Sequence, residues 1–100
     1  MSIVTAHQPG LPEDQMIAAM ARDGFEAVEK VYAPGKTEPH RHDYDVCLYI
    51  LEGEFSLADA DRGLVHRFGP GDKVFVPRGT AHAEEHGALR MIVGRRHSAE

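Results

Sequence analysis

The chain has 100 residues, 42% of them hydrophobic, and a formal net charge of −5. This length fits one domain with a single core, and the ordinary apolar content excludes a disordered chain. The acidic balance argues against nucleic acid as a partner, although Arg95, Arg96 and His97 form a small basic cluster near the C-terminus.

A membrane or secreted location is not expected either. The chain has no apolar run near the roughly 20 residues that cross a bilayer. The N-terminus lacks the basic start and apolar stretch of a signal peptide, and Cys47 is the only cysteine, so no disulfide framework is available. We therefore expect a cytoplasmic protein with no membrane partner.

The N-terminal quarter predicts a loop followed by a short helix. Residues 1–10 show no periodic pattern, and the glycine and prolines around them indicate a loop. Pro12 suits a first helical turn, the two acidic residues after it favour the positive end of the helix dipole, and Gly24 is a suitable stop. Met16 and Met20 lie four residues apart, so we expect this face of the helix to pack on the rest of the domain.

Beyond Gly24 the apolar residues predict about eight short strands. Turn residues separate the strands at intervals of about 8–12 residues, which is typical of a sandwich or barrel. The clearest candidates are residues 25–33, 46–51, 53–60, 64–68, 73–77, 81–86 and 88–94. The sequence therefore predicts an all-β fold, a small antiparallel β-barrel formed by residues 25–100, with residues 1–24 packing on it through their short helix.

Four of the seven histidines occur in two pairs, His40 with His42 and His82 with His86. Residues two apart in a strand project from the same face, so His40 and His42 would present two imidazoles to one metal ion. The alternative is a solvated pair in a loop, and a third ligand from elsewhere decides between them; His82 is the candidate. No specific role is expected for the remaining three, His7, His66 and His97.

The segment that contains His82 has a distinctive spacing. Gly71, Pro77, Gly79 and His82 follow the pattern G-x5-P-x-G-x2-H, in which a strand ends at the proline and the glycine allows a tight turn. His86 stands four residues after His82.

The earlier histidine segment has a second pattern. His40, His42 and Gly53 fit G-x5-H-x-H-x3,4-E-x6-G, although Gly35 lies one residue too close to His40. Together the two patterns resemble the two motifs of the cupin superfamily, in which asparagine usually stands at the position of His86. The position of the motif's glutamate, counted back from Gly53, holds Val46.

The resemblance implies a double-stranded β-helix, or jelly-roll, barrel with a metal ion in its mouth. The ligands that carry over are His40, His42 and His82, and the family's fourth ligand is missing. Three histidines with open coordination positions suit a divalent Fe, Mn, Ni, Cu or Zn ion, and imidazole alone does not select among these.

Three residues have a claim to the vacant ligand position. Strand alternation points Asp45 outward, so it reaches the metal only if a bulge shifts the register. Cys47 is expected to be a buried structural thiol. His86 shares the parity of His82 and could be a fourth ligand or an acid–base group, but a surface position fits as well.

The same alternation predicts the walls of the pocket. The residues expected to face inward are Tyr44, Val46, Leu48 and Ile50. Tyr44 could also donate a hydrogen bond to a bound ligand. The acidic pair Glu84–Glu85 is expected to be solvated, and Arg67 and Arg90 to lie on the surface. No catalytic residue is assigned.

Two functions stay open. The first is a small metalloenzyme that binds an oxygen-bearing small molecule or dioxygen, with dioxygenase or isomerase chemistry. The alternative is a non-catalytic module that binds a small molecule or a metal, for example as a sensor. A barrel this small leaves apolar surface to cover, so we expect a homodimer formed through an edge strand or the helix.

Overall fold

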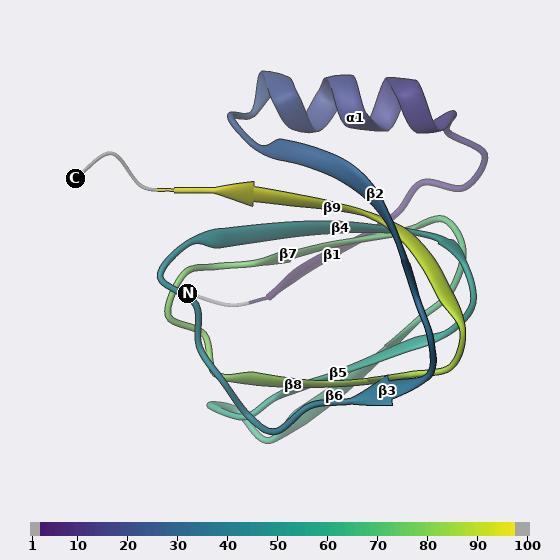
Figure 1. Ribbon diagram of the computed structural model, residues 1–100. Helices are drawn as coiled ribbons and strands as arrows, with labels where there is room; N and C mark the ends of the chain where they lie inside the picture. Colours follow the sequence, from purple (N-terminus) through teal and green to yellow (C-terminus); the bar gives the residue numbers. More distant parts are fainter. Residues whose placement is uncertain (1–2, 98–100) are drawn as a thin grey trace.

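The structure is a computed structural model that describes residues 3–97. Two antiparallel sheets face each other, and a single helix lies outside one of them (Figure 1). The described elements are β1 (Val4–His7), α1 (Glu13–Arg22), β2 (Glu26–Tyr32), β3 (Gly35–Lys36), β4 (Asp45–Glu52), β5 (Phe55–Asp59), β6 (Leu64–Phe68), β7 (Asp72–Val76), β8 (His82–His86) and β9 (Leu89–Arg96). The expected all-β fold with one N-terminal helix is confirmed.

The strands divide into a five-stranded and a four-stranded sheet. The first has the order β1-β7-β4-β9-β2 and the second the order β3-β8-β5-β6. Within the described residues, α1 has only 10 residues, and no helix has the length and apolarity of a membrane span.

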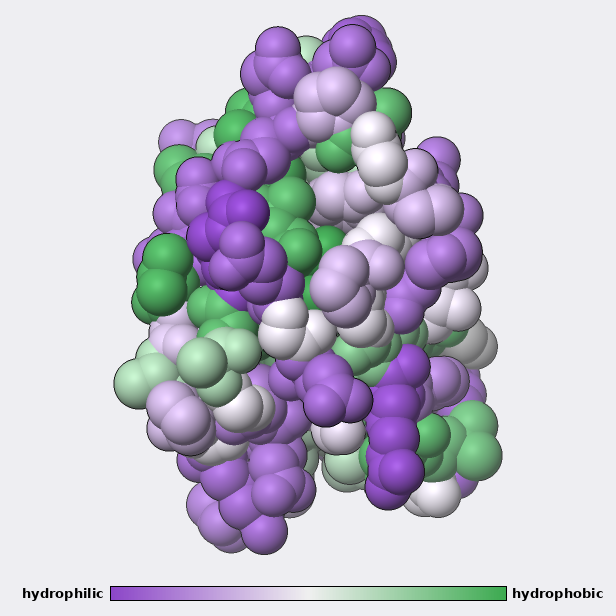
Figure 2. Space-filling view, turned by 90° about the vertical axis from the view of Figure 1, so that its right-hand side faces the viewer, coloured by the Kyte–Doolittle hydropathy of each residue, from purple (hydrophilic) through white to green (hydrophobic). Residues whose placement is uncertain are grey.

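Among residues 3–97, the large apolar side chains that are most exposed lie on strands at the edges of the two sheets. On the face shown in Figure 2, hydrophobic residues form small groups among hydrophilic ones. The large hydrophobic residues that are more than half exposed are Val4 on β1, Val28 and Val31 on β2, and Leu64 and Val65 on β6. Each of these strands has a hydrogen-bonded neighbour on one side only, which leaves its other edge free to pair.

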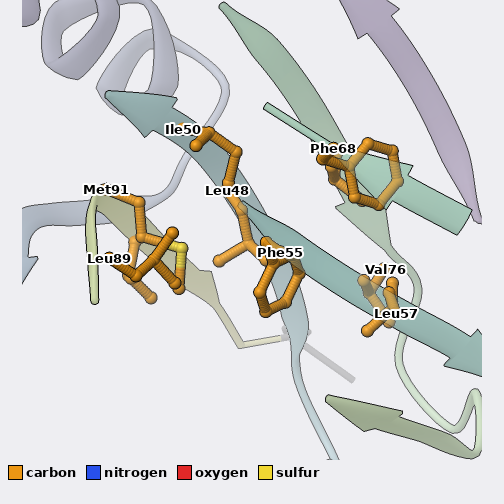
Figure 3. Close-up of a cluster of buried hydrophobic side chains, with 10 residues drawn as sticks. Leu48, Ile50, Phe55, Leu57, Phe68, Val76, Leu89 and Met91 are labelled. Carbon is orange, nitrogen blue, oxygen red and sulfur yellow. The ribbon is translucent and has the colours of Figure 1, made fainter. Parts of the chain in front are cut away.

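The inner core fills the space between the two sheets. Phe55 and Leu57 of β5 are buried, and the residues between and beside them are more exposed, as expected for a strand with one face inward. They meet Leu48 and Ile50 of β4, and Figure 3 shows these side chains pointing toward one another. Burial of each such side chain contributes roughly 1.5–3 kcal/mol.

A second apolar cluster lies between the five-stranded sheet and α1. Met16 and Met20 are fully buried and pack with Cys47 and Tyr49, which project from β4 on the face opposite Leu48. The expected packing of the methionine stripe is thus confirmed. The unbroken apolar run of β4 follows from this arrangement, because both faces of the strand are covered.

The N-terminal residues form a strand where an irregular segment was expected. Val4–His7 pairs with β7 at the edge of the five-stranded sheet. All four of its residues are exposed, so the sequence has no alternation that could reveal the strand. His7 is held there by Asp72, whose Oδ1 lies 2.6 Å from His7 Nδ1. The segment before the helix therefore contributes a strand to the same sheet as the barrel strands.

The glycine that ends the first sequence motif occupies a tight turn. Gly53 joins β4 to β5 with a φ of 97°, a value that favours glycine. A Cβ atom at this position would lie 2.3 Å from the carbonyl oxygen of Ala88. Gly53 therefore lets the chain pass close to the start of β9 as it crosses from one sheet to the other.

Candidate metal centre

Backbone hydrogen bonds join the first histidine segment to the start of β8. His40 and His82 each donate an amide proton to the carbonyl oxygen of the other, both at 2.9 Å. The amide of Gly79 donates to the carbonyl oxygen of His42, also at 2.9 Å. Residues 41–44 are irregular, which corrects the expectation of a regular strand through both histidines. The main chain alone therefore brings His82 beside His40 and His42.

The three imidazole rings form one compact cluster. Ring centroids are 4.5 Å apart for His40 and His82, 4.9 Å for His40 and His42, and 5.3 Å for His42 and His82. One nitrogen from each ring lies within 4.8 Å of the other two. These three nitrogens could bind a single metal ion.

Two of the rings are oriented by backbone carbonyl groups. His40 Nδ1 lies 2.8 Å from the carbonyl oxygen of Glu38, and His82 Nδ1 lies 2.8 Å from that of Thr80. A carbonyl oxygen only accepts, so each Nδ1 carries a proton, and in the neutral ring each Nε2 is left with a lone pair. Metal-binding histidines usually have their second nitrogen held in this way.

A carboxylate that the sequence predicts to be solvated faces the same cluster. Glu84 Oε2 lies 3.3 Å from His40 Nε2 and 3.4 Å from His82 Nε2, and the Glu84 side chain is only 25% exposed. The expectation of a solvated acidic pair therefore fails for Glu84 and holds for its exposed neighbour, Glu85. Glu84 shares the parity of His82 on β8, a signal that could have identified it.

The ionisation of these groups reflects their proximity. The hydrogen bond with the His82 ring lowers the pKa of Glu84, with the neighbouring rings of His40 and His42 acting in the same direction. Burial alone would lower the pKa of His82, but the contact with Glu84 and the hydrogen bond to the carbonyl oxygen of Thr80 together outweigh it and raise this pKa. Burial and the two neighbouring rings lower the pKa of His42. The site thus favours an ionised carboxylate beside a positive charge.

A cavity of about 110 Å³ opens beside the cluster. Its polar side is formed by His42, His82 and Glu84, and its remaining walls are mainly apolar. The apolar and aromatic side chains that line it are Tyr32, Tyr44, Val46, Leu48, Leu57, Val76, Met91 and Val93. A small molecule in this cavity would touch the histidine cluster at one end and apolar side chains elsewhere.

One cation also lines the cavity. The guanidinium carbon of Arg95 lies 5.4 Å from the ring centroid of Tyr44, and the Tyr44 ring stacks on His42 with a centroid distance of 4.7 Å. Within residues 3–97, no carboxylate lies within ion-pair distance of Arg95, although its neighbour Arg96 is paired. Arg95 can therefore receive an anionic group of a ligand.

An ion pair outside the cluster connects its two histidine segments. Arg41 stands between His40 and His42 and donates to the carbonyl oxygen of Gly79 at 2.7 Å. Its guanidinium also meets Asp61 at 3.2 Å, and Asp61 accepts the amide proton of Ala81 at 3.1 Å. This contact supports the approach of His40 to the chain just before His82.

The structure places Asp45 away from the cluster, in contacts of its own. Its carboxylate accepts the amide proton of Arg78 at 2.8 Å and pairs with the guanidinium of Arg96 at 2.9 Å. Burial would raise the pKa of Asp45, but these two contacts outweigh it and lower the pKa. Asp45 is not among the residues that line the cavity. Its outward direction agrees with strand alternation, so no bulge turns it toward the histidines.

His86, the other proposed acid–base group, lies farther along β8. Its Nδ1 hydrogen-bonds the carbonyl oxygen of Gly87 at 2.8 Å, and its ring packs against Tyr32 and Phe55. Neither the three-histidine cluster nor the lining of the cavity includes it.

The expected pocket residues separate into two groups. Tyr44, Val46 and Leu48 line the cavity, whereas Ile50 is fully buried in the inner core cluster. The difference arises because β4 runs from the histidine cluster into the core. Ile50 therefore points inward but lies beyond the end of the cavity. Cys47 is buried under α1, and this burial raises the pKa of its thiol.

The structure resembles several solved proteins. A DUF861 family protein from Thermotoga maritima superposes with a TM-score of 0.64 and 18% identity, covering 92% of this chain and 97% of that one. An RmlC-like cupin from Shewanella frigidimarina gives 0.62 and 24%, covering 77% and 69%. The polyketide cyclase RemF from Streptomyces resistomycificus gives 0.62 and 30%, covering 91% of this chain and 63% of that one.

Comparison at the level of sequence agrees with these superpositions. Among curated proteins there is no match. The sequence model of the cupin domain matches residues 28–93, which include both histidine segments and most of the barrel. With two thirds of the chain matched and the fold shared with solved cupins, the chain belongs to the cupin domain family.

Proposed function

We propose that this protein binds one divalent transition-metal ion and uses it to hold a small molecule in the adjoining cavity. The ligands would be His40, His42 and His82. The observation that carries the proposal is the fixed orientation of His40 and His82, whose Nε2 lone pairs are directed into one cluster by carbonyl contacts at Nδ1. A bound ion would act as a Lewis acid toward a ligand oxygen atom.

The other cavity residues suggest what the small molecule is. The apolar walls suit a compact hydrophobic body, and Arg95 suits an anionic oxygen at one end. We therefore propose an oxygen-bearing, partly apolar anion as the ligand. RemF is named as a polyketide cyclase and is 30% identical to this chain, which supports including polyketide-like diketones and aromatic diols among the compounds tested.

Metal content tests the first part of the proposal. Protein purified without a histidine tag should contain or take up about one Fe, Mn, Ni, Cu or Zn ion per chain. His82→Ala should lose this ion, and His66→Ala should keep it, because His66 lies on β6 outside the cluster. A wild-type protein that binds none of these metals under titration would refute the proposal.

Turnover separates an enzyme from a binding module. The metal-loaded protein should be tested for oxygen uptake and for product formation with thiols, diketones and aromatic diols. A non-catalytic sensor is the alternative, and the small volume of the cavity, about 110 Å³, favours it. Saturable binding without product would support the sensor, whereas product lost in His82→Ala would support the enzyme.

A further inference from the structure

We propose that Glu84 is the fourth protein ligand of the metal centre, supplied from β8 in place of the glutamate that the family pattern has on β4. The inference rests on the proposed metal site. Val46, which occupies the family's glutamate position, has no atom that can bind a metal, and it lines the apolar wall of the cavity.

The distances match a shared cation. Two ligands that each lie about 2.0–2.1 Å from one ion at a tetrahedral angle are themselves about 3.3 Å apart. An ion with four such protein ligands would take an oxygen atom of a small molecule as a fifth ligand. Glu84 Oε2 lies 3.3 Å from His40 Nε2 and 3.4 Å from His82 Nε2. One oxygen therefore has this spacing to two of the proposed ligands at the same time.

The protonation of the rings also calls for a cation at this point. Because His40 and His82 use their Nδ1 protons on carbonyl oxygens, the Nε2 atoms of the neutral rings present lone pairs to the lone pairs of Glu84. Lone pairs that face each other repel unless a metal ion or an added proton lies between them. Glu84 is largely buried, and among residues 3–97 its ion-pair partners are these two histidines, so an uncompensated charge there would be costly.

The backbone of Glu84 is well placed to hold its side chain in position. Its amide donates to Thr37 Oγ1 at 3.0 Å, and its carbonyl oxygen accepts the amide proton of Thr37 at 2.9 Å. On its other side β8 pairs with β5, where Glu84 is opposite Leu57. Neighbours on both sides therefore fix the backbone of Glu84, so that its side chain projects from the face of β8 on which His82 lies. Glu85, the next residue, is exposed and points the other way.

A metal titration with a matched pair of variants tests the assignment. Wild type, Glu84→Gln and Glu85→Gln, each freed of metal, are titrated with Zn²⁺ and with Co²⁺, whose visible absorption reports the ligand set. We expect Glu84→Gln to weaken binding by at least about tenfold and to change the cobalt spectrum. Glu85→Gln should match the wild type in both measurements.

The outcomes separate this inference from the function on which it rests. If the wild type binds metal, His82→Ala does not, and Glu84→Gln equals the wild type in affinity and spectrum, Glu84 is not a ligand although the three-histidine site stands. If the wild type binds no metal, both proposals fail, and Glu84 is one half of an imidazolium–carboxylate pair. Circular dichroism checks the fold of each variant; should Glu84→Gln not fold, Glu84→Asp, with its shorter reach, is expected to show the same loss and is titrated instead.

Discussion

His40 and His82 are joined by a pair of reciprocal backbone hydrogen bonds at 2.9 Å, so their rings are neighbours before any metal binds. A site whose ligands are already held together loses less conformational entropy on binding than one that must be assembled. The contacts that support this pair should therefore affect metal affinity even where they provide no ligand.

Removal of the Arg41 side chain should weaken metal binding although every ligand remains. Arg41 connects the histidine segment to Gly79 and Asp61. Without it, His40 and His42 should move more freely relative to His82, and we expect a loss of affinity of up to about tenfold in Arg41→Ala. Calorimetric titration measures the change. The matched control is Arg62→Ala, which breaks a different ion pair in the neighbouring turn; equal affinities in the two variants would contradict the supporting role.

Asp45→Asn should affect stability toward acid and leave metal affinity unchanged. The folded-state pKa of Asp45 is lowered below its ordinary value of 3.8. Its contribution to stability is therefore present above about pH 3.8 and is lost as the pH falls through the folded-state value.

For this variant we expect a decrease in the free energy of unfolding of about 1 kcal/mol or less at neutral pH, and a smaller decrease in strong acid. Urea unfolding across pH 2–7 measures this dependence. A constant difference between the two proteins over this range would show that the Asp45 carboxylate has no such role, and a loss of metal affinity would make Asp45 a ligand after all.

Arg90 is expected to stabilise the fold by joining three elements. Its guanidinium pairs with Glu13 of α1 at 2.6 Å, Glu29 of β2 at 2.9 Å and Glu52 of β4 at 3.2 Å. In Arg90→Gln these carboxylates lose their common cation, so we expect the thermal midpoint to fall by a few degrees. The fall should be smaller in high salt, because salt screens the charges. Arg67→Gln, which alters an exposed arginine on β6, is the control and should unfold as the wild type does.

Arg95→Gln should reduce the affinity for anionic ligands specifically. The expected loss is about tenfold, equivalent to about 1.4 kcal/mol. It can be measured by competition against the visible spectrum of the cobalt-loaded protein. A neutral analogue of the same ligand serves as the control, since its affinity should not depend on Arg95. If the affinities for the anionic and the neutral ligand fall by the same factor, Arg95 shapes the cavity and does not recognise charge.

The expected homodimer can be tested at the free edge of β2. Val28 and Val31 are 52% and 75% exposed there, and pairing with a second copy would place a strand beside them. Val31→Lys should shift the protein toward the monomer in sedimentation velocity experiments. Val65→Lys, a similarly exposed valine at the edge of the other sheet, should sediment as the wild type does. A wild type that is monomeric at all concentrations would rule out the dimer.

The predicted strands and helix agree with the structure wherever the order of apolar and polar residues within a short segment indicates the element. The apolar residues of the 53–60 segment and the methionine stripe each reflect a preference that acts over a few residues. Val4–His7 was missed because it is an exposed edge strand, and β7 alone determines its conformation. Ile50 was assigned to the pocket because alternation gives the direction of a side chain but not its depth.

The sequence by itself determined the family motifs, the all-β fold and the choice of His40, His42 and His82, because each of these depends on spacing along the chain. Only the tertiary structure decided which carboxylate approaches them. Asp45 is close to His42 in sequence, yet Arg78 and Arg96, brought to it by β7 and β9, hold it elsewhere. Glu84 is distant from His40 in sequence. The backbone pairing of His40 with His82 nevertheless brings Glu84 Oε2 to 3.3 Å from His40 Nε2. Contacts between charged groups depend on distance in space, and strand pairing sets that distance.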